Sequence, residues 1–303
     1  MAVHSFLHYA LTVPDLSVGQ NFYTDFGFTD MTGQSNTVRL RPATVDRDQV
    51  LLYEGRRKRL HHLAFGASGE EYERVRAMLQ AAGVTELDPP TDDTAGGIWF
   101  RDPDGNLVNV RDEAAPKIPI EPVTLFNGPG NPQRIGDRAV NPPFPDRARP
   151  RRLGHVMMFS PQLEKQRAFY TDVLGMLVSD DVSGIVTFLR CTSDHHNLAF
   201  LRSSHPGFHH GSFEVGDVDE IAMGAVRMQD RGWQPGWGLG RHCIGSNFFF
   251  YMKDPWGSYA EYFFDIDHIP EGYAWQPRDW DPSLALYAWG PDVPRDFEVN
   301  KEE

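Results

Sequence analysis

Three residues in the second half of the chain have the chemistry of a metal-binding set: His155, His210 and Glu261. Two neutral imidazoles and one carboxylate on an octahedral ion leave three coordination positions free. This arrangement suits a non-heme Fe(II) ion that binds an organic substrate and dioxygen together. The residue types therefore predict an oxygenase. Mn(II) is the alternative ion, because it shares the preference for imidazole and carboxylate.

A duplication within the chain supports this prediction. A lone histidine on an apolar strand is more often a hydrogen-bonded core residue than a metal ligand, so recurrence matters. Residues 7–28 (LHYALTVPDLSVGQNFYTDFGF) match residues 154–176 (GHVMMFSPQLEKQRAFYTDVLGM). In both segments a histidine-led apolar stretch precedes FYTD and a glycine. The two halves of the chain therefore read as copies of one unit.

The first copy has only part of the metal-binding set. Corresponding residues lie at a nearly constant separation along the chain: His8 and His155 (155 − 8 = 147), His62 and His210 (210 − 62 = 148), Asn109 and Glu261 (261 − 109 = 152). A neutral amide is a weak ligand for Fe(II) because it supplies no charge. We therefore predict that the first site is vestigial, with His8 and His62 as core histidines. The alternative is a weak metal site of their own.

Each copy has the pattern of a strand, a helix and then several strands. Residues 156–159 predict a buried strand, and a helical stripe over 163–174 ends at Gly175. A second stripe, ended by Gly232, predicts an amphipathic helix with one packed face formed by Val218, Ile221, Ala222, Ala225 and Val226. Short aromatic or β-branched runs predict further strands at 185–190, 197–202, 210–215, 247–252 and 259–264. The pattern predicts an α+β fold of paired βαβββ modules with curved mixed sheets.

Two tandem domains are expected, over residues 1–135 and 136–303. Residues 112–150 are rich in proline and charge and predict an extended linker. The tail after residue 268 contains four large aromatic residues among prolines, Trp275, Trp280, Tyr287 and Trp289. A tail this aromatic is expected to pack onto the body, beside the mouth of the site.

Composition narrows the class of partner. The formal charge of −13 and the pI near 5.3 argue against nucleic acid or an anionic membrane surface. No apolar run approaches the roughly 18 to 20 residues of a membrane helix, and no basic segment precedes the first apolar stretch. We therefore expect a cytoplasmic protein with a small-molecule partner. Cys191 and Cys243 form no CxxC pair and receive no role.

The second copy also resembles a known family. Its signature comprises Gly240, His242, Phe250, Tyr251, Asp254, Pro255, Gly257 and Glu261. These residues and their spacing resemble the type I extradiol ring-cleaving dioxygenases of the vicinal oxygen chelate superfamily, of the 2,3-dihydroxybiphenyl 1,2-dioxygenase and catechol 2,3-dioxygenase type. The resemblance covers nearly the whole chain and is strongest after residue 150.

The resemblance implies roles for individual residues. His155, His210 and Glu261 would hold Fe(II), and His196 would be the acid/base histidine, with adjacent His195 as the alternative. Further roles fall to His242 and Tyr251, which would hydrogen-bond the substrate oxygens and the oxygen-derived intermediate. Without the signature, Tyr251 could equally be a buried aromatic residue and His242 a strand-end histidine.

The function implied is Fe(II)-dependent cleavage of a catechol-type ring by O2 in the degradation of aromatic compounds, by a homo-oligomer. A metal-dependent glyoxalase-like isomerase and a non-catalytic binding protein of the same superfamily are the alternatives. The substrate is expected to be a small aromatic diol, with alkyl-substituted or bicyclic diols favoured. Candidates for the pocket lining, chosen by position and size, are Phe188, Trp233, Trp237, Phe248 and Phe249.

Overall fold

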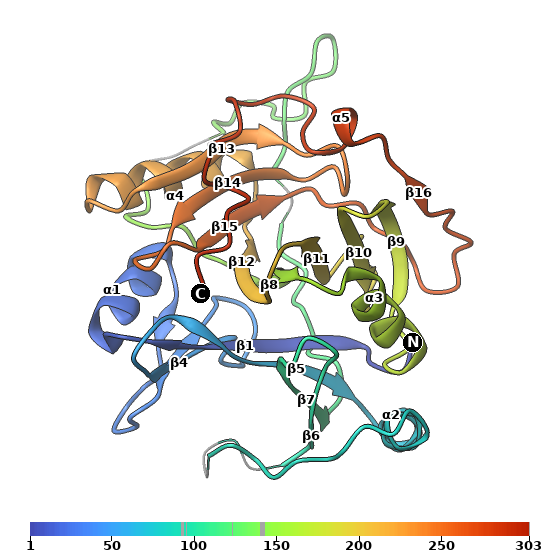
Figure 1. Ribbon diagram of the computed structural model, residues 1–303. Helices are drawn as coiled ribbons and strands as arrows, with labels where there is room; N and C mark the ends of the chain where they lie inside the picture. The colour runs from blue at the N-terminus through green and yellow to red at the C-terminus, as the bar shows by residue number, and fades with distance from the viewer. Residues whose placement is uncertain (92–93, 95, 123, 140–142, 303) are drawn as a thin grey trace.

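Two β-sheets, one in each half of the chain, form the framework of the protein (Figure 1). The computed structural model describes residues 1–91, 94, 96–122, 124–139 and 143–302. Both sheets contain parallel and antiparallel neighbours, and helices pack against them. None of the described helices is both long enough and apolar enough to cross a membrane. The predicted α+β fold with two tandem domains is confirmed.

The first sheet has seven strands in the order β2-β3-β4-β1-β5-β7-β6. Its first module has three strands after the helix. Its second has two, because Leu87 makes only an isolated bridge to Trp99. The elements are β1 (Ser5–Val13), α1 (Leu16–Phe26), β2 (Thr29–Asp30), β3 (Val38–Arg41), β4 (Val50–Glu54), β5 (Arg59–Ala67), α2 (Glu70–Ala81), β6 (Ile98–Arg101) and β7 (Leu107–Asp112).

The second sheet repeats this arrangement with two complete βαβββ modules. Its order is β13-β14-β15-β12-β8-β11-β10-β9-β16, so that β8, β12 and β15 take the places of β1, β5 and β7. The elements are β8 (Arg152–Ser160), α3 (Leu163–Asp172), β9 (Leu177–Val182), β10 (Val186–Arg190), β11 (Leu198–Arg202), β12 (Gly207–Glu214), α4 (Val218–Asp230), β13 (Pro235–Arg241), β14 (Phe248–Lys253), β15 (Tyr259–Phe264), β16 (Arg278–Asp279) and α5 (Pro282–Ala285).

Both helices predicted in the second copy are present, with one error in the buried face of α4. Gly175, at φ 69°, follows α3 where the stop was expected. Val226 is 52% exposed, so its predicted place on the packed face is wrong. It lies roughly 150° around the helix from the centre of that face. The residues that α4 buries are Ile221, Gly224, Ala225 and Met228.

The linker and the tail differ in how they attach to the body. No helix or strand is found in the described part of residues 113–151, which runs beside both sheets (Figure 1). The tail after residue 268 packs onto the second domain as predicted. Its indole nitrogens donate hydrogen bonds inward, from Trp275 to the Ser179 carbonyl (2.7 Å) and from Trp280 to the Asp180 carboxylate (2.9 Å).

The apolar core is continuous between the two domains. The ring of Phe26 in α1 stacks on Tyr262 in β15, with the ring centroids 3.8 Å apart. Tyr9 in β1 packs against Phe208 in β12 at 4.9 Å. The first domain therefore supports the back of the strand that carries His210.

The approach of Tyr9 to this strand requires a glycine at position 211. A Cβ atom added to Gly211 would lie 2.5 Å from the Tyr9 ring, which is too close for any side chain. Gly211 follows His210 directly, so the domain contact and the candidate site share one strand segment.

We expect Gly211→Ala to destabilise the fold by about 1–3 kcal/mol, because the overpacked ring or strand must shift. Urea unfolding followed by tryptophan fluorescence measures the change. Gly128→Ala is the matched control, since its Cβ would find no atom closer than 3.8 Å, and it should change the unfolding free energy by less than about 0.5 kcal/mol. Equal stability of the Gly211 variant and the natural protein would contradict the packing argument.

Candidate metal centre

The register of three adjacent strands brings the predicted metal set together. Ser212 in β12 lies opposite His155 in β8 and also opposite Glu261 in β15. His210 precedes Ser212 by two residues, so both point to the same face of β12. Side chains from β8, β12 and β15 therefore converge on one side of the sheet.

These three side chains form a compact buried group. The Nε2 atoms of His155 and His210 lie 3.1 Å and 3.4 Å from Oε2 of Glu261. The potential ligand atoms all lie within 4.8 Å of one another, and no other group of three such residues was found in the part of the chain that the structure describes. Glu261 has 0% exposure. A buried carboxylate beside two imidazoles is the donor set that a divalent transition-metal ion prefers.

The hydrogen bonding of His210 fits a metal ligand. Nε2 of His209 lies 2.7 Å from the carbonyl oxygen of Phe297, which only accepts, so this nitrogen carries the proton. Nδ1 of neutral His209 is then an acceptor for Nδ1–H of His210, 2.7 Å away. Nε2 of His210 is left with a free lone pair, and it is a buried atom with no hydrogen-bond partner. A ligand histidine whose other ring N–H is fixed in this way is the usual arrangement at protein metal sites.

Burial keeps the imidazoles of His209 and His210 neutral. It is the largest cause that lowers the pKa of His210 well below its ordinary value, followed by the neighbouring histidines. It also lowers the pKa of His209 to about 4. A neutral imidazole is the form that coordinates metal.

The first domain repeats the register without the carboxylate. Ala64 in β5 lies opposite His8 in β1 and opposite Asn109 in β7, as Ser212 does in the second domain. Asn109 and Glu261 therefore occupy equivalent strand positions, as the duplication predicted. His8 and His62 contact each other through their Nε2 atoms at 2.9 Å.

Asn109 is fully engaged by its own domain. Its amide nitrogen donates to the carbonyls of Gly96 and Ile98 (3.3 Å each), and its oxygen accepts from Nε of Arg111 at 2.9 Å. Burial first and the charge of Arg111 second lower the pKa of His8. A guanidinium at this place opposes a second cation, in keeping with a vestigial site.

His196 lies beside the group through its ring. The His196 and His155 ring centroids are 4.2 Å apart, and Phe188 packs edge-on against His196 at 5.0 Å. Burial is the largest cause that lowers the pKa of His196, followed by the surrounding histidines. His195, the alternative considered from the sequence, points to Asp180 instead, with Nε2 3.2 Å from Oδ2.

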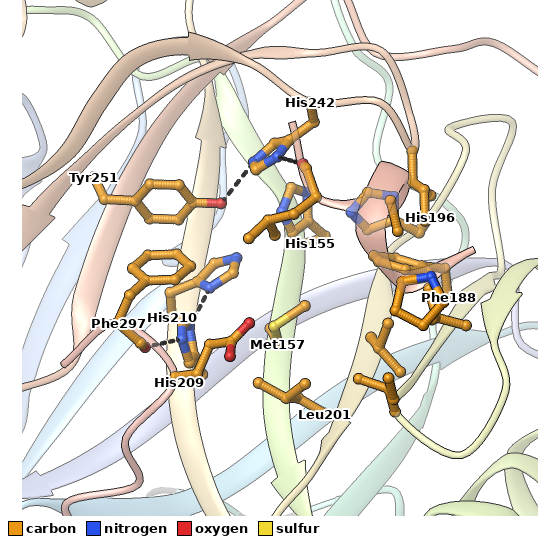
Figure 2. A pocket seen from close by; sticks show the side chains of 18 residues that line it. His155, Met157, Phe188, His196, Leu201, His209, His210, His242, Tyr251 and Phe297 are labelled. Carbon is orange, nitrogen blue, oxygen red and sulfur yellow. Dashed lines mark hydrogen bonds between the residues drawn. The ribbon is translucent and has the colours of Figure 1, made fainter. Parts of the chain in front are cut away.

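His242 and Tyr251 contact each other on the other flank of the group (Figure 2). Nε2 of His242 lies 3.0 Å from the Tyr251 hydroxyl, and its Nδ1 donates to the carbonyl of Leu286 at 2.7 Å. Tyr251 faces Glu261 across the antiparallel pair of β14 and β15. Burial and the nearby Glu261 raise the pKa of Tyr251, so that its hydroxyl keeps its proton.

A cavity of about 290 Å³ opens beside these residues (Figure 2). Seven polar side chains belong to its lining: His155, His196, His209, His210, His242, Tyr251 and Glu298. Apolar side chains line the remainder, among them Met157, Val182, Ile185, Val186, Phe188, Leu201, Ile244, Ala285 and Leu286. This arrangement suits a flat apolar ligand with polar groups at one end.

Of the five aromatic residues considered for the lining, only Phe188 is correctly placed. Trp237 and Phe249 belong to a buried aromatic cluster, and Phe248 packs against Trp289. Trp233 contacts Phe22 of the first domain. Their size predicted burial but not the direction of the side chain.

Several residues at the site were not predicted. The tail contributes Pro282, Ala285, Leu286, Phe297 and Glu298 to the cavity wall, and Asn247 donates weakly to Glu261 at 3.4 Å. The HH pair at 209–210 was the only sequence signal for His209. No periodicity marks the tail residues, because their positions depend on tertiary contacts.

Comparison with known proteins matches both domains. The family model for the Glyoxalase/Bleomycin resistance protein/Dioxygenase superfamily matches residues 5–110 and 152–262. The chain is 42% identical to metapyrocatechase 2 from Cupriavidus necator, over 99% of this chain and 93% of that protein. It is 28% identical to an iron-dependent extradiol dioxygenase from Rhodococcus jostii strain RHA1, over 75% of each chain.

A solved structure shares the fold. The crystal structure of the Mn(II)-bound glyoxalase from Novosphingobium aromaticivorans superposes with a TM-score of 0.79 at 26% identity, covering 97% of this chain and 93% of that one. The two-domain arrangement is therefore shared with a solved relative whose name specifies Mn(II).

Replacing Glu261 by Gln should weaken metal binding, because the amide removes the negative charge of the set. We expect the loss of affinity to exceed the roughly 10- to 100-fold that removal of an outer-shell partner costs. Elemental analysis after gel filtration measures the metal bound per chain. Asn109→Asp, the carboxylate variant at the equivalent position, should bind no additional metal because Arg111 remains beside it. Full metal content and full activity of the Gln variant would contradict the assignment.

Stability of the metal-free protein should fall with acid, partly through His209. The pKa of His209 is about 4 in the folded chain and about 6.5 in the unfolded chain. The unfolded chain therefore binds the proton first, and this contribution, fully present above pH 6.5, is lost as the pH falls towards 4. Between pH 7 and pH 5 it amounts to about 2 kcal/mol. Urea unfolding at both pH values should show that the unfolding free energy of His209→Gln changes less between pH 7 and pH 5 than that of the natural protein. An equal change would show that His209 does not contribute to the acid sensitivity.

Proposed function

Because the chain belongs to the Glyoxalase/Bleomycin resistance protein/Dioxygenase superfamily and is an extradiol ring-cleaving dioxygenase, we propose that it uses Fe(II) and O2 to cleave a catechol-type ring beside the two hydroxyl groups. The main support for this proposal is the position of the candidate metal ligands beside the cavity. Two histidines and a glutamate from adjacent strands present a free imidazole lone pair at the polar part of an otherwise apolar cavity. Such a site can hold an ion and an aromatic diol together.

His155, His210 and Glu261 would hold the ion in this proposal. When bound, the ion supplies Lewis-acid binding of the two substrate oxygens and the route by which electrons pass from the ring to O2. The remaining steps depend on the side chains of the protein. The apolar wall excludes water and holds the ring flat, which orients the two hydroxyl groups towards the polar part of the cavity.

His196 is the proposed acid/base residue. Its ring lines the cavity, and no hydrogen-bond partner for its Nε2 atom was found among the described residues. This nitrogen can take a proton from a substrate hydroxyl and later return it to a departing oxygen. The opposite flank offers the Tyr251 hydroxyl and His242, which can hydrogen-bond the substrate oxygens.

The metal is proposed to be Fe(II), with Mn(II) as the alternative. The relative from Rhodococcus jostii is named for iron, whereas the solved glyoxalase contains Mn(II). Imidazole and carboxylate ligands suit both ions. The relative named for iron supports Fe(II), whereas a manganese-dependent 2,3-dihydroxybiphenyl 1,2-dioxygenase from Geobacillus genomosp. 3, 25% identical over 96% of this chain, supports the alternative.

A metal-dependent isomerization is the second candidate, favoured by the glyoxalase named among the similar structures. It would use the same buried ligands without consuming O2. A non-catalytic binding protein would need neither the ion nor the acid/base histidine, and the convergence of His155, His196, His210 and Glu261 speaks against it.

The proposal includes the setting expected from the sequence. Both cysteines are free thiols, Cys191 buried and Cys243 partly buried, in keeping with a reducing cytoplasm. The partners are a small aromatic diol and O2, and the enzyme acts as a homo-oligomer.

The assay that tests the reaction combines metal analysis with oxygen consumption. Protein loaded anaerobically with Fe(II) should consume one O2 for each catechol and give a yellow ring-cleavage product, whereas Zn(II)-loaded protein should not. Alkyl- and aryl-substituted catechols should exceed carboxylated catechols in kcat/KM by more than about tenfold, because the apolar wall desolvates a carboxylate without a partner. Conversion without O2 consumption would indicate the isomerase instead.

Replacing His196 by Phe should separate catalysis from metal binding. The variant keeps the ring packing against Phe188 and loses the proton acceptor, so kcat should fall by about 100- to 10,000-fold. The metal bound per chain should remain as in the natural enzyme. Half-buried His205, outside the cavity lining, provides the control His205→Phe, which should keep the natural kcat. An unchanged rate for the His196 variant would remove this residue from the mechanism.

A further inference from the structure

Behind His196 lies a chain of two further buried residues. Nδ1 of His196 is 3.1 Å from Nδ1 of His195, and Nε2 of His195 is 3.2 Å from Oδ2 of Asp180. Both histidines and the aspartate are at least nine-tenths buried by their exposed fractions of 4%, 0% and 3%. The three side chains therefore lead from the cavity into the protein without access to bulk water.

The carboxylate at the end of this chain determines where the protons lie. An ionised carboxylate only accepts hydrogen bonds, so Nε2 of His195 must carry a proton. In neutral His195 the Nδ1 atom is then an acceptor. Because two acceptors cannot face each other, Nδ1 of His196 carries the proton between the two rings. Nε2 of His196 is left with its lone pair directed to the cavity side of the ring.

The tail holds Asp180 in its ionised, accepting state. The backbone N–H of Arg278 donates to Oδ1 at 2.7 Å, and Nε1 of Trp280 donates to Oδ2 at 2.9 Å. Burial alone would raise the pKa of Asp180, but these donors and His195 outweigh it, and the pKa lies below the ordinary value. With the pKa lowered and two donors from the tail beside it, Asp180 acts as the hydrogen-bond acceptor for His195.

The other HH pair in this domain follows the same logic. There, His209 donates to the Phe297 carbonyl and accepts from His210. The lone pair on Nε2 of His210 is therefore free to coordinate the proposed ion. In both pairs the first histidine donates to an acceptor: the Phe297 carbonyl of the tail for His209, and Asp180, which the tail contacts, for His195. In both pairs the second histidine keeps a free Nε2 atom. The same hydrogen-bond pattern is thus found at two places that share no hydrogen bonds.

We propose that His195, fixed by Asp180, is a positioning residue that holds His196 as the Nδ1–H tautomer with Nε2 free to accept the substrate proton. The inference rests on the proposed function for the role of His196, but the tautomer is a property of the protein alone. The proton taken from a substrate hydroxyl would go to Nε2 of His196 and the hydroxyl oxygen would keep the electron pair. His195 itself would touch neither substrate nor ion.

Nitrogen-15 NMR of histidine-labelled protein tests the tautomer directly. Zn(II)-loaded protein is diamagnetic and keeps the ligand set occupied. Long-range couplings between ring protons and nitrogens should identify His196 as the Nδ1–H form, with the assignment made by the loss of signals in His196→Phe. In His195→Leu, which has no acceptor for Nδ1–H, the Nε2–H form should appear. An Nε2–H tautomer in the natural protein would overturn the proposal, whatever the enzyme's activity.

Steady-state kinetics of two substitutions test the consequence for catalysis. A Gln at position 195 can donate its amide N–H to Asp180 and accept Nδ1–H through its carbonyl, whereas Leu can do neither. We expect His195→Leu to lower kcat by about 10- to 100-fold with the natural metal content, and His195→Gln to recover most of the loss. Trp280→Phe removes one of three donors to Asp180 and should lower kcat by less than about threefold.

The outcomes separate this inference from the proposed function. If no catechol is cleaved by any form of the enzyme, the proposed function fails while the tautomer measurement still decides the role of His195. If ring cleavage occurs and His195→Leu retains both the Nδ1–H tautomer and the natural kcat, the positioning role is wrong. Equal losses in the Leu and Gln variants, with natural metal content, would also contradict it, because packing and not hydrogen bonding would then explain the effect.

Discussion

The fully buried carboxylate of Glu261 is the constraint on which the rest of the site depends. A carboxylate removed from water needs compensation by positive charge or several hydrogen bonds. Its neutral donors are Nε2 of His155 at 3.1 Å and, more weakly, Asn247 at 3.4 Å. Nε2 of His210, 3.4 Å from the same carboxylate, has no hydrogen-bond partner, and burial lowers the pKa of that imidazole. The charge of this carboxylate, more than the presence of the histidines, supports the proposal of a divalent cation at this place.

The proposed metal site and its counterpart in the first domain differ by a small change. Both have the same register, with Ala64 and Ser212 each opposite two members of the set. Two residues beyond Asn109 lies Arg111, which donates to that amide. Two residues beyond Glu261 lies Phe263, whose ring packs beside His155. The first domain therefore has a guanidinium group at the position where the second has an aromatic ring.

The sequence could predict the features that depend on the internal duplication or on the alternation of apolar and polar residues along a strand. The duplication paired the three residues of the metal set with their counterparts in the first copy, and short aromatic runs located the two strands that carry Tyr251 and Glu261. Strand β13 could not be predicted, because PGWGLGR has no alternation of apolar and polar residues. The role of Asp180 could not be predicted from the sequence either. Its importance comes from contacts with His195 and Trp280, which are distant in sequence and carry no motif.

The first domain contributes to the candidate site through its contacts with the tail. Residues of the tail contact both HH pairs: the Phe297 carbonyl accepts a hydrogen bond from His209, and Trp280 donates to Asp180, the partner of His195. The end of the tail is fixed in turn by the first domain, where buried Lys58 pairs with Glu302 and also donates to the carbonyl of Phe208 at 3.1 Å. Since Phe208 precedes His209, one lysine contacts both the tail and the strand that carries the ligand. The first domain thus contributes to the site by holding these two segments together, a task that needs no metal of its own.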